Sequence, residues 1–254
     1  MRLKFIYVLL ALVTSLPLRG QGQVSTRAHR LADFPDKVTQ VVLTGDPILS
    51  AALQEEVVNG WTASAFEFCT LEQFRERMTS DKYYFLAILD TRRKGEDAPG
   101  VSFLTLMKGG PEGAKGMGAL HEVAALPLVA SEGGDGREFT YLGALVQAIQ
   151  EYTLAARESE KAAYGMAHWF KKRFHLDGKQ LLLEPAQADE AFLSYAPDAL
   201  STYVVAPANP GKGSCCYKMV FDAASHSLIY LDCHKLSAKK GAGFLPEDLK
   251  RLRK

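Results

Sequence analysis

Residues 38–47 read VTQVVLTGDP, a stretch that joins a strand to the start of a helix. Residues 38–43 form a short, mostly apolar run that is typical of a strand. Asp46 is placed to cap a helix, and Pro47 fits the first helical position, where its missing N–H costs nothing. Apolar residues then keep a helical spacing as far as Gly60. The sequence therefore predicts a strand followed by a helix.

A second strand followed by a helix comes directly after the first. Ser64 to Cys69 alternates as a strand does, and Thr70 to Gln73 is a capping box that predicts a second helix ending near Asp81. Tyr83 to Leu89 is nearly continuous in apolar residues, which predicts a strand buried on both faces. Two strand–helix units and a third strand predict an α/β layer with helices packed on a sheet.

Two further strands are expected to extend this layer. Val101 to Met107 predicts a fourth strand, and Leu126 to Ala130 predicts a fifth. We therefore expect an α/β domain over residues 38–135, with an α+β arrangement as the alternative class.

From residue 139 the apolar pattern becomes helical. Apolar residues between Leu142 and Phe170 recur at intervals of three, four or seven, which predicts an amphipathic helix over residues 139–176. Gly165 would divide this stretch into a helix pair, and both readings stay open. One unbroken helix would be about 54 Å long, more than a compact domain needs. Such a helix would favour a role in binding a partner.

The C-terminal part predicts a β-hairpin and a short tail helix. Residues 216–222 and 228–236 are strand-like and flank a polar turn at residues 223–227. A basic helix starts near Pro246. We expect residues 198–254 to pack on the same body as the α/β domain.

The chain begins with the pattern of a secretory signal peptide. Met1 to Lys4 carries two basic residues, and the apolar run that follows to Leu18 is too short to remain as a membrane anchor. We expect residues 1–20 to be removed, residues 21–37 to form a tether, and the mature protein to be periplasmic or extracellular. The nearest cysteine is Cys69, which excludes a lipid on a new N-terminal cysteine.

Composition narrows the classes of partner. The formal net charge of +1 over 254 residues gives no electrostatic argument for binding nucleic acid or an anionic membrane. No later segment reaches the length of a membrane span. No motif requires a cofactor, and none is expected. The expected partner is a protein of the cell envelope.

Three residues are candidates for catalysis. Cys69 falls at the carboxyl end of a predicted strand, where sites gather in α/β folds. His121 and Glu122 follow the glycine-rich stretch and would have to meet Cys69 in space. A small buried cysteine is the simpler interpretation. No GxSxG or HExxH motif accompanies these residues, so no reaction is assigned.

The glycine-rich stretch from Lys108 to Gly118 is a candidate for ligand binding. It follows a strand, as phosphate-binding loops do, and its contacts would come from Gly109, Gly110 and Lys115. The spacing of a P-loop fails because Ala114 stands where a glycine is needed. A flexible loop, or a lid over a small ligand, remains the interpretation.

The four cysteines raise two possibilities. In a register that the hairpin turn allows, Cys216 faces Cys233 at the separation of a cross-strand disulfide, although a slip of one residue would part them. The alternative is zinc bound by Cys215, Cys216, Cys233 and His234. Adjacent ligands do not match the CxxC spacing of zinc sites, so no metal is expected.

Four stretches carry a resemblance to known sequences: Trp61, FEFC at 66–69, YYFL at 83–86 and KGGP at 108–111. Together they resemble uncharacterised exported proteins of Gram-negative bacteria. That group has no known activity, so the resemblance implies export and no reaction. The order of strands and helices is also similar in outline to small α/β domains of envelope-assembly proteins, which is an analogy of fold.

The leading functional hypothesis is an exported, non-catalytic binding or assembly protein of the bacterial cell envelope. The alternative is an exported thiol-dependent or hydrolytic enzyme that uses Cys69 or His121. A third hypothesis is a small-ligand binder with the 109–118 loop as its lid.

Overall fold

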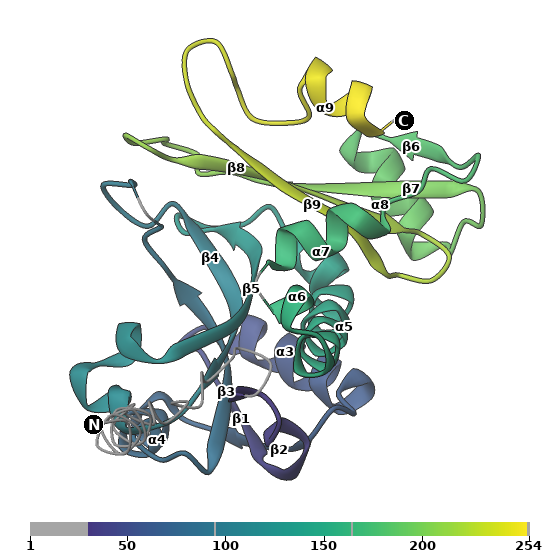
Figure 1. Ribbon diagram of the computed structural model, residues 1–254. Coiled ribbons are helices and arrows are strands. Elements are labelled where there is room, and N and C mark those ends of the chain that lie inside the picture. Colours follow the sequence, from purple (N-terminus) through teal and green to yellow (C-terminus); the bar gives the residue numbers. More distant parts are fainter. Residues whose placement is uncertain (1–29, 94, 164, 253–254) are drawn as a thin grey trace, which may run out of the picture.

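The computed structural model describes residues 30–93, 95–163 and 165–252, which are coloured in Figure 1. Its mixture of helices and strands confirms the predicted α/β class. The predicted signal peptide, 1–20, and residues 21–29 of the predicted tether lie outside the described residues. Within the described ranges, no helix has both the length and the apolar composition that crossing a membrane requires.

The first half of the chain forms a five-stranded sheet, which we call sheet A. Its strand order is β2-β1-β3-β4-β5, with β1, β2 and β3 parallel and with β4 and β5 antiparallel to their neighbours. The elements are β1 Val38–Val42, α3 Pro47–Gly60, β2 Ala65–Cys69, α4 Leu71–Arg77, β3 Tyr83–Asp90, β4 Val101–Lys108 and β5 His121–Ala130.

Two caps start α3 and α4 where the sequence predicts them. The Asp46 carboxylate accepts hydrogen bonds from two amides in the first turn of α3, at 2.8 and 3.2 Å. Thr70 and Gln73 bond reciprocally at the start of α4, as a capping box does. These side chains satisfy amides that the first helical turn leaves unpaired.

Residues 30–37 are folded and do not form the expected tether. Leu31 and Phe34 are buried in the main apolar core. The Phe34 ring packs on that of Tyr84, with centroids 4.9 Å apart, and on that of Trp61 at 6.2 Å. A separation of three residues places Leu31 and Phe34 on one side of a turn. Leu31 and Phe34 therefore anchor this segment on the core.

The helical pattern over residues 139–176 forms three helices instead of one. Helix α5 ends at Ser159, where the backbone becomes extended, and Gly165 separates the next two helices. The Tyr152 hydroxyl donates a hydrogen bond to the carbonyl of Ala162 at 3.0 Å, which holds the second helix against the first. The unbroken helix was therefore the wrong alternative. The three helices are α5 Arg137–Glu158, α6 Glu160–Ala163 and α7 Met166–Arg173.

The second half forms a four-stranded sheet, sheet B, in the order β6-β7-β8-β9. The predicted hairpin is present as β8 and β9, and the predicted tail helix is α9. The elements are β6 Gln180–Leu182, α8 Pro185–Leu193, β7 Ala199–Val205, β8 Cys215–Asp222, β9 Leu228–Lys235 and α9 Pro246–Leu252.

Helix α9 packs on sheet B through a buried ion pair. The Lys218 ammonium lies 2.5 Å from the Asp248 carboxylate, and both side chains are 1% exposed. Asp248 also accepts hydrogen bonds from the Leu245 amide at 2.8 Å and from Arg251 at 2.9 Å. These bonds compensate the cost of burying the carboxylate.

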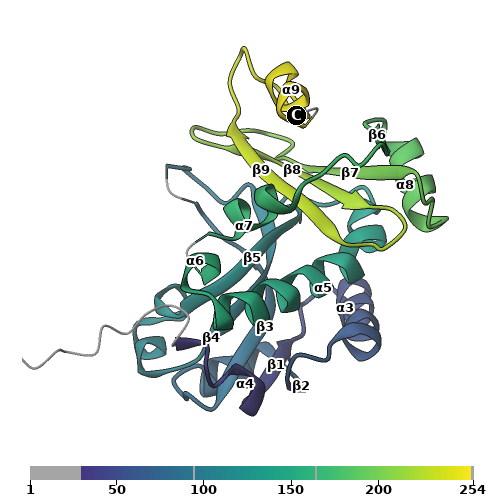
Figure 2. The ribbon, with the colours of Figure 1, turned by 45° about the vertical axis from the view of Figure 1, so that its right-hand side comes forward.

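Helix α5 joins the two sheets. Figure 2 shows α5 between the strands of sheet A and those of sheet B. Its Tyr141 stacks on Tyr203 of β7, with ring centroids 4.6 Å apart. Its Arg137 donates two hydrogen bonds to Asp189 of α8, at 2.7 and 2.8 Å. One apolar cluster contains buried residues from both sheets and from α5, so the described chain shares a common core.

Candidate functional site

Cys69 and His121 do not meet in the structure. Cys69 ends β2 and His121 begins β5, and these strands are the two opposite edges of sheet A. With three strands between them, the two positions are about 19 Å apart across the sheet, at roughly 4.8 Å per strand. Cys69 is 2% exposed, and burial raises the pKa of its thiol to about 11. The geometry gives no support to a catalytic pair made of these residues.

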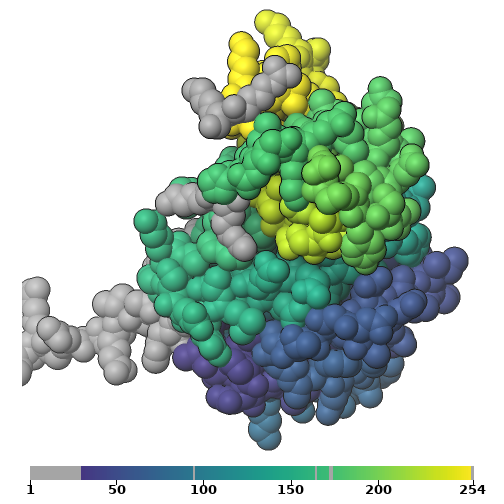
Figure 3. Space-filling view, turned by 90° about the vertical axis from the view of Figure 1, so that its right-hand side faces the viewer, coloured from purple at the N-terminus to yellow at the C-terminus, as the bar shows by residue number. Residues whose placement is uncertain are grey.

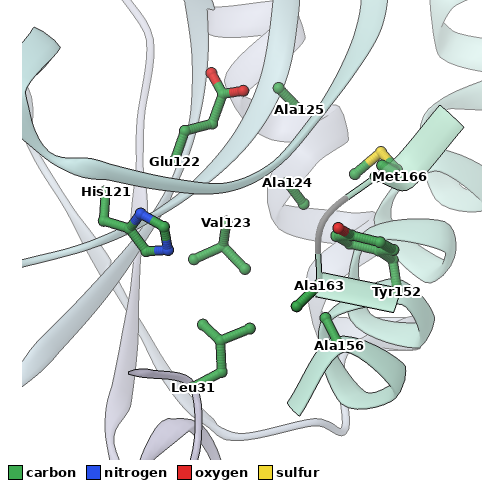
Figure 4. Close-up of a pocket in the computed structure, with 11 residues that line it drawn as sticks. Leu31, His121, Glu122, Val123, Ala124, Ala125, Tyr152, Ala156, Ala163 and Met166 are labelled. Atoms are coloured by element: carbon green, nitrogen blue, oxygen red, sulfur yellow. The ribbon is translucent and has the colours of Figure 1, made fainter. Parts of the chain in front are cut away.

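His121 lines a small pocket of about 170 Å³ at the free edge of β5 (Figure 4). Its side chain and that of Val123 point to the Leu31 side of the strand, whereas Glu122 points to the other side (Figure 4). Glu122 forms an ion pair with Arg93 at 3.0 Å. His121 and Glu122 therefore do not act as an acid–base pair with each other.

Two amides of the glycine-rich loop bond to the backbone of neighbouring segments. The amides of Gly109 and Gly110 donate hydrogen bonds to the carbonyls of Tyr83 and Met78 at 2.9 and 3.1 Å. These amides are consequently not directed at a phosphate. The third expected contact residue, Lys115, is exposed and forms an ion pair with Glu112. The loop includes two short 3₁₀ helices, Pro111–Lys115 and Met117–Ala119.

The expected disulfide between Cys216 and Cys233 does not form in this structure. Cys216 pairs with His234 across the hairpin, and Cys233 pairs with Tyr217. This register differs by one residue from the one the disulfide needs, so the two side chains lie on opposite faces of sheet B. All four cysteines, Cys215 included, are free thiols. In the described part of the chain, no three His, Cys, Asp or Glu side chains group as metal ligands would.

A larger groove, which the sequence does not predict, lies between α3, α5, α8 and the hairpin turn. Its volume is about 540 Å³, within the range of ligand sites. Figure 3 views this side of the molecule, with α3 and α5 in blue and teal below α8 and the hairpin in green and yellow. We call it the α3–α8 groove. Its lining comes from four separate parts of the chain: residues 56–60, 139–151, 192–195 and 225–227.

A stack of three rings forms one wall of the α3–α8 groove. The His226 imidazole lies between the rings of Phe192 and Tyr195, at centroid distances of 3.8 and 4.0 Å, with 14° between the planes in each case. Its Nε2 is 2.7 Å from the Phe192 carbonyl oxygen. Because a carbonyl only accepts, Nε2 carries a proton, and Nδ1 is the nitrogen that can accept in the tautomer with its single proton on Nε2.

The backbone at this wall is strained. Tyr195 and His226 both have φ values of 55°, in the left-handed region that non-glycine residues seldom adopt. Such conformations cost free energy and are frequent at binding sites, where neighbouring structure holds them. Here the stacked rings and the bond to the Phe192 carbonyl hold both residues in place.

The other wall of the α3–α8 groove is acidic. Glu56 of α3 and Glu151 of α5 line it, and none of the described residues that line it is a lysine or arginine. Gly143 of α5 leaves room for Glu56, since a Cβ atom there would lie 2.3 Å from the Glu56 Oε2. Burial, and then the charge of Glu55, raises the pKa of the Glu56 carboxyl. The carboxylate therefore lies against a helix backbone without a neutralising cation from the described chain.

The rim of the α3–α8 groove carries exposed apolar side chains. Leu193 and Tyr195 are 63% and 60% exposed, and Phe139 is also exposed. Together with the ring stack and the carboxylates, they offer apolar contact and hydrogen-bond acceptors. His226 is bonded to a main-chain carbonyl and not to a serine or a carboxylate. Apolar contact together with hydrogen-bond acceptors is typical of sites that bind a ligand or a protein segment.

Comparison with known proteins adds no identification: no family model matches the chain, and no curated protein or solved structure is significantly similar to it.

Proposed function

We propose that this chain is an exported, non-catalytic binding protein of the bacterial cell envelope, and that a protein partner binds in the α3–α8 groove. The observation that carries the proposal is a groove of about 540 Å³ whose rim exposes Leu193, Tyr195 and Phe139. Aromatic side chains are enriched at the centres of protein interfaces, where they supply large contact areas.

The cellular location that we propose for the protein depends on the N-terminal pattern. Two basic residues and a short apolar run are typical of a cleaved export signal, so we place the mature chain in the periplasm or outside the cell. The separation of Cys69 from His121 favours a binding role over the thiol-enzyme alternative.

Site-specific photo-crosslinking in the native host tests the proposal. A benzophenone amino acid at position 193 should crosslink the partner, whereas the same group at position 48 should not. Ile48 is a suitable control because it is 70% exposed, comparable to Leu193 at 63%, and does not line the groove. Tyr195→Ser, combined with the group at position 193, should abolish the product by removing a neighbouring contact.

Two crosslinking results would contradict the proposal. One is an identical set of products from positions 193 and 48. The other is a position-193 product that persists in Tyr195→Ser, because a partner held in the groove must contact that ring. Turnover of a substrate by the purified mature protein would also contradict the non-catalytic role.

A further inference from the structure

We infer that the α3–α8 groove selects a positively charged side chain, a lysine or arginine next to an apolar or aromatic residue in the partner segment. This inference rests on the proposed function and adds the chemistry of the partner. It depends on three features of the groove: its charge, the placement of Glu56 and the rings beside it.

The first feature is the sign of the charge. The Glu56 carboxylate lies in the lining, and the described lining residues include no lysine or arginine. Opposite charge across an interface gives specificity, and like charge disfavours a competing partner. A basic side chain is therefore favoured in this groove, and an acidic one is disfavoured.

The second feature is the space that α5 leaves for Glu56. Gly143 lies within α5, where glycine is less favourable than alanine by about 1 kcal/mol. Its missing Cβ admits the Glu56 carboxylate, because an added Cβ would lie 2.3 Å from Oε2. Within the described ranges, no lysine or arginine forms an ion pair with this carboxylate. A lysine or arginine of the bound partner would supply the positive charge that pairs with this carboxylate.

The third feature is the nature of the neighbouring groups. In the tautomer that donates from Nε2 to the Phe192 carbonyl, Nδ1 of His226 can accept a hydrogen bond from an ammonium group, as the Glu56 carboxylate can. The exposed ring of Tyr195 provides a face for a cation or for the alkyl stem of a lysine. Leu193 and Phe139 then contact an apolar neighbour of that lysine.

Three synthetic peptides that differ at one position test the inference. The probes are Ac-SLKWLS-NH₂, Ac-SLQWLS-NH₂ and Ac-SLEWLS-NH₂, titrated into the purified chain and followed by calorimetry or by amide chemical shifts. We expect the lysine peptide to bind about tenfold more tightly than the glutamine peptide, which corresponds to a charge-assisted bond of about 1.4 kcal/mol. The glutamate peptide should bind most weakly. Added salt should reduce the preference for lysine.

Two variants locate the preference at Glu56. Glu56→Gln should bring the lysine and glutamine peptides to nearly equal affinity while leaving the glutamine peptide unchanged. Gly143→Ala should have the same effect by displacing the carboxylate, because the atom in its way is the end of a flexible side chain and the helix backbone stays in place. Glu76→Gln is the matched control, since Glu76 is an exposed glutamate on α4 and does not line the groove.

The outcomes separate this inference from the proposed function. Equal affinity for the three peptides, tighter binding of the glutamate peptide, or no binding of any peptide overturns the inference. So does a lysine preference that survives in Glu56→Gln. None of these results affects the crosslinking experiment at position 193, which tests independently whether a protein binds in the groove.

Discussion

The Cys69 thiol lies in an apolar cluster with Phe74, Phe85 and Met107, on the side of sheet A that α4 covers. At 2% exposure and with a pKa raised by burial to about 11, it carries almost no thiolate near neutral pH. We therefore expect Cys69 to resist iodoacetamide in the folded protein and to react fully in urea. Peptide mass spectrometry after brief labelling in each condition measures this.

The same labelling contains its own control. Cys233 is exposed at the surface of the hairpin and should be modified in the folded protein before Cys69 and the buried Cys216. Rapid labelling of Cys69 under native conditions would show that the thiol is accessible, and it would restore the case for a thiol enzyme.

The contribution of Asp33 to the stability of the fold depends on pH. Burial alone would raise the pKa of its carboxyl, but hydrogen bonds from Lys108, Lys37 and Tyr84 outweigh that effect and hold the pKa below its usual range. A carboxyl with a lowered pKa adds to the stability of the fold above its unfolded pKa, and this contribution is lost as the pH falls through the folded pKa. Asp33→Asn should therefore lower the free energy of unfolding at neutral pH.

Urea titrations at neutral and acidic pH measure this contribution. The difference between the native chain and Asp33→Asn should shrink as the pH falls below about 4, the ordinary range of aspartate. A difference that stays constant down to acidic pH would mean that the ion pairs of Asp33 do not stabilise the fold.

Helix α9 should depend on its buried ion pair. Asp248→Asn leaves the Lys218 ammonium buried beside a neutral amide, and breaking a buried pair in this way costs about 3–5 kcal/mol. Urea unfolding followed by circular dichroism measures the loss. The double variant Lys218→Met with Asp248→Leu should recover much of it, because an apolar pair of similar volume removes the need for charge compensation.

An exposed ion pair between α9 and the segment before it provides the control. Lys240 and Glu247 lie 2.9 Å apart with half-exposed side chains, so Glu247→Gln should change stability far less than Asp248→Asn. Equal losses from both variants would show that burial adds nothing to the Lys218–Asp248 interaction.

Elements with local signals could be predicted from the sequence, and those set by contacts could not. The strands of sheet A and the caps at Asp46 and Thr70 depend on neighbouring residues, and the structure contains them. Helix α5 ends at Glu158, and the bond from Tyr152 to Ala162 that holds α6 against it forms only in the folded chain. The hairpin was also predictable, but its register was not, because an irregularity between Val220 and Phe221 shifts the pairing by one residue, so that Cys216 faces His234 instead of Cys233.

The α3–α8 groove could not be predicted for a related reason. Its members are distant in sequence, and each has a simple interpretation alone: Glu56 as an exposed helix residue and His226 as part of a polar turn. Only the folded chain places the end of α8 beside the hairpin turn, which brings Phe192 and Tyr195 around His226. Local periodicity contains no information about that contact.

The common core of the two sheets predicts a single unfolding transition for the whole molecule. Trp61 packs near sheet A and Trp169 packs on Tyr152 of α5, and these are the two tryptophans of the chain. In Trp169→Phe and in Trp61→Phe, fluorescence should report the same urea midpoint as far-ultraviolet circular dichroism. Separate midpoints in either variant would show that the sheets unfold independently.

Burial of the segment at Leu31 and Phe34 sets an order of events in an exported chain. Leu31 enters the core about ten residues after the expected cleavage region, and ten extended residues span at most about 35 Å. That length barely exceeds the hydrocarbon thickness of a bilayer. If the leader is removed as proposed, we expect its removal to precede the packing of Phe34 on Trp61 and Tyr84.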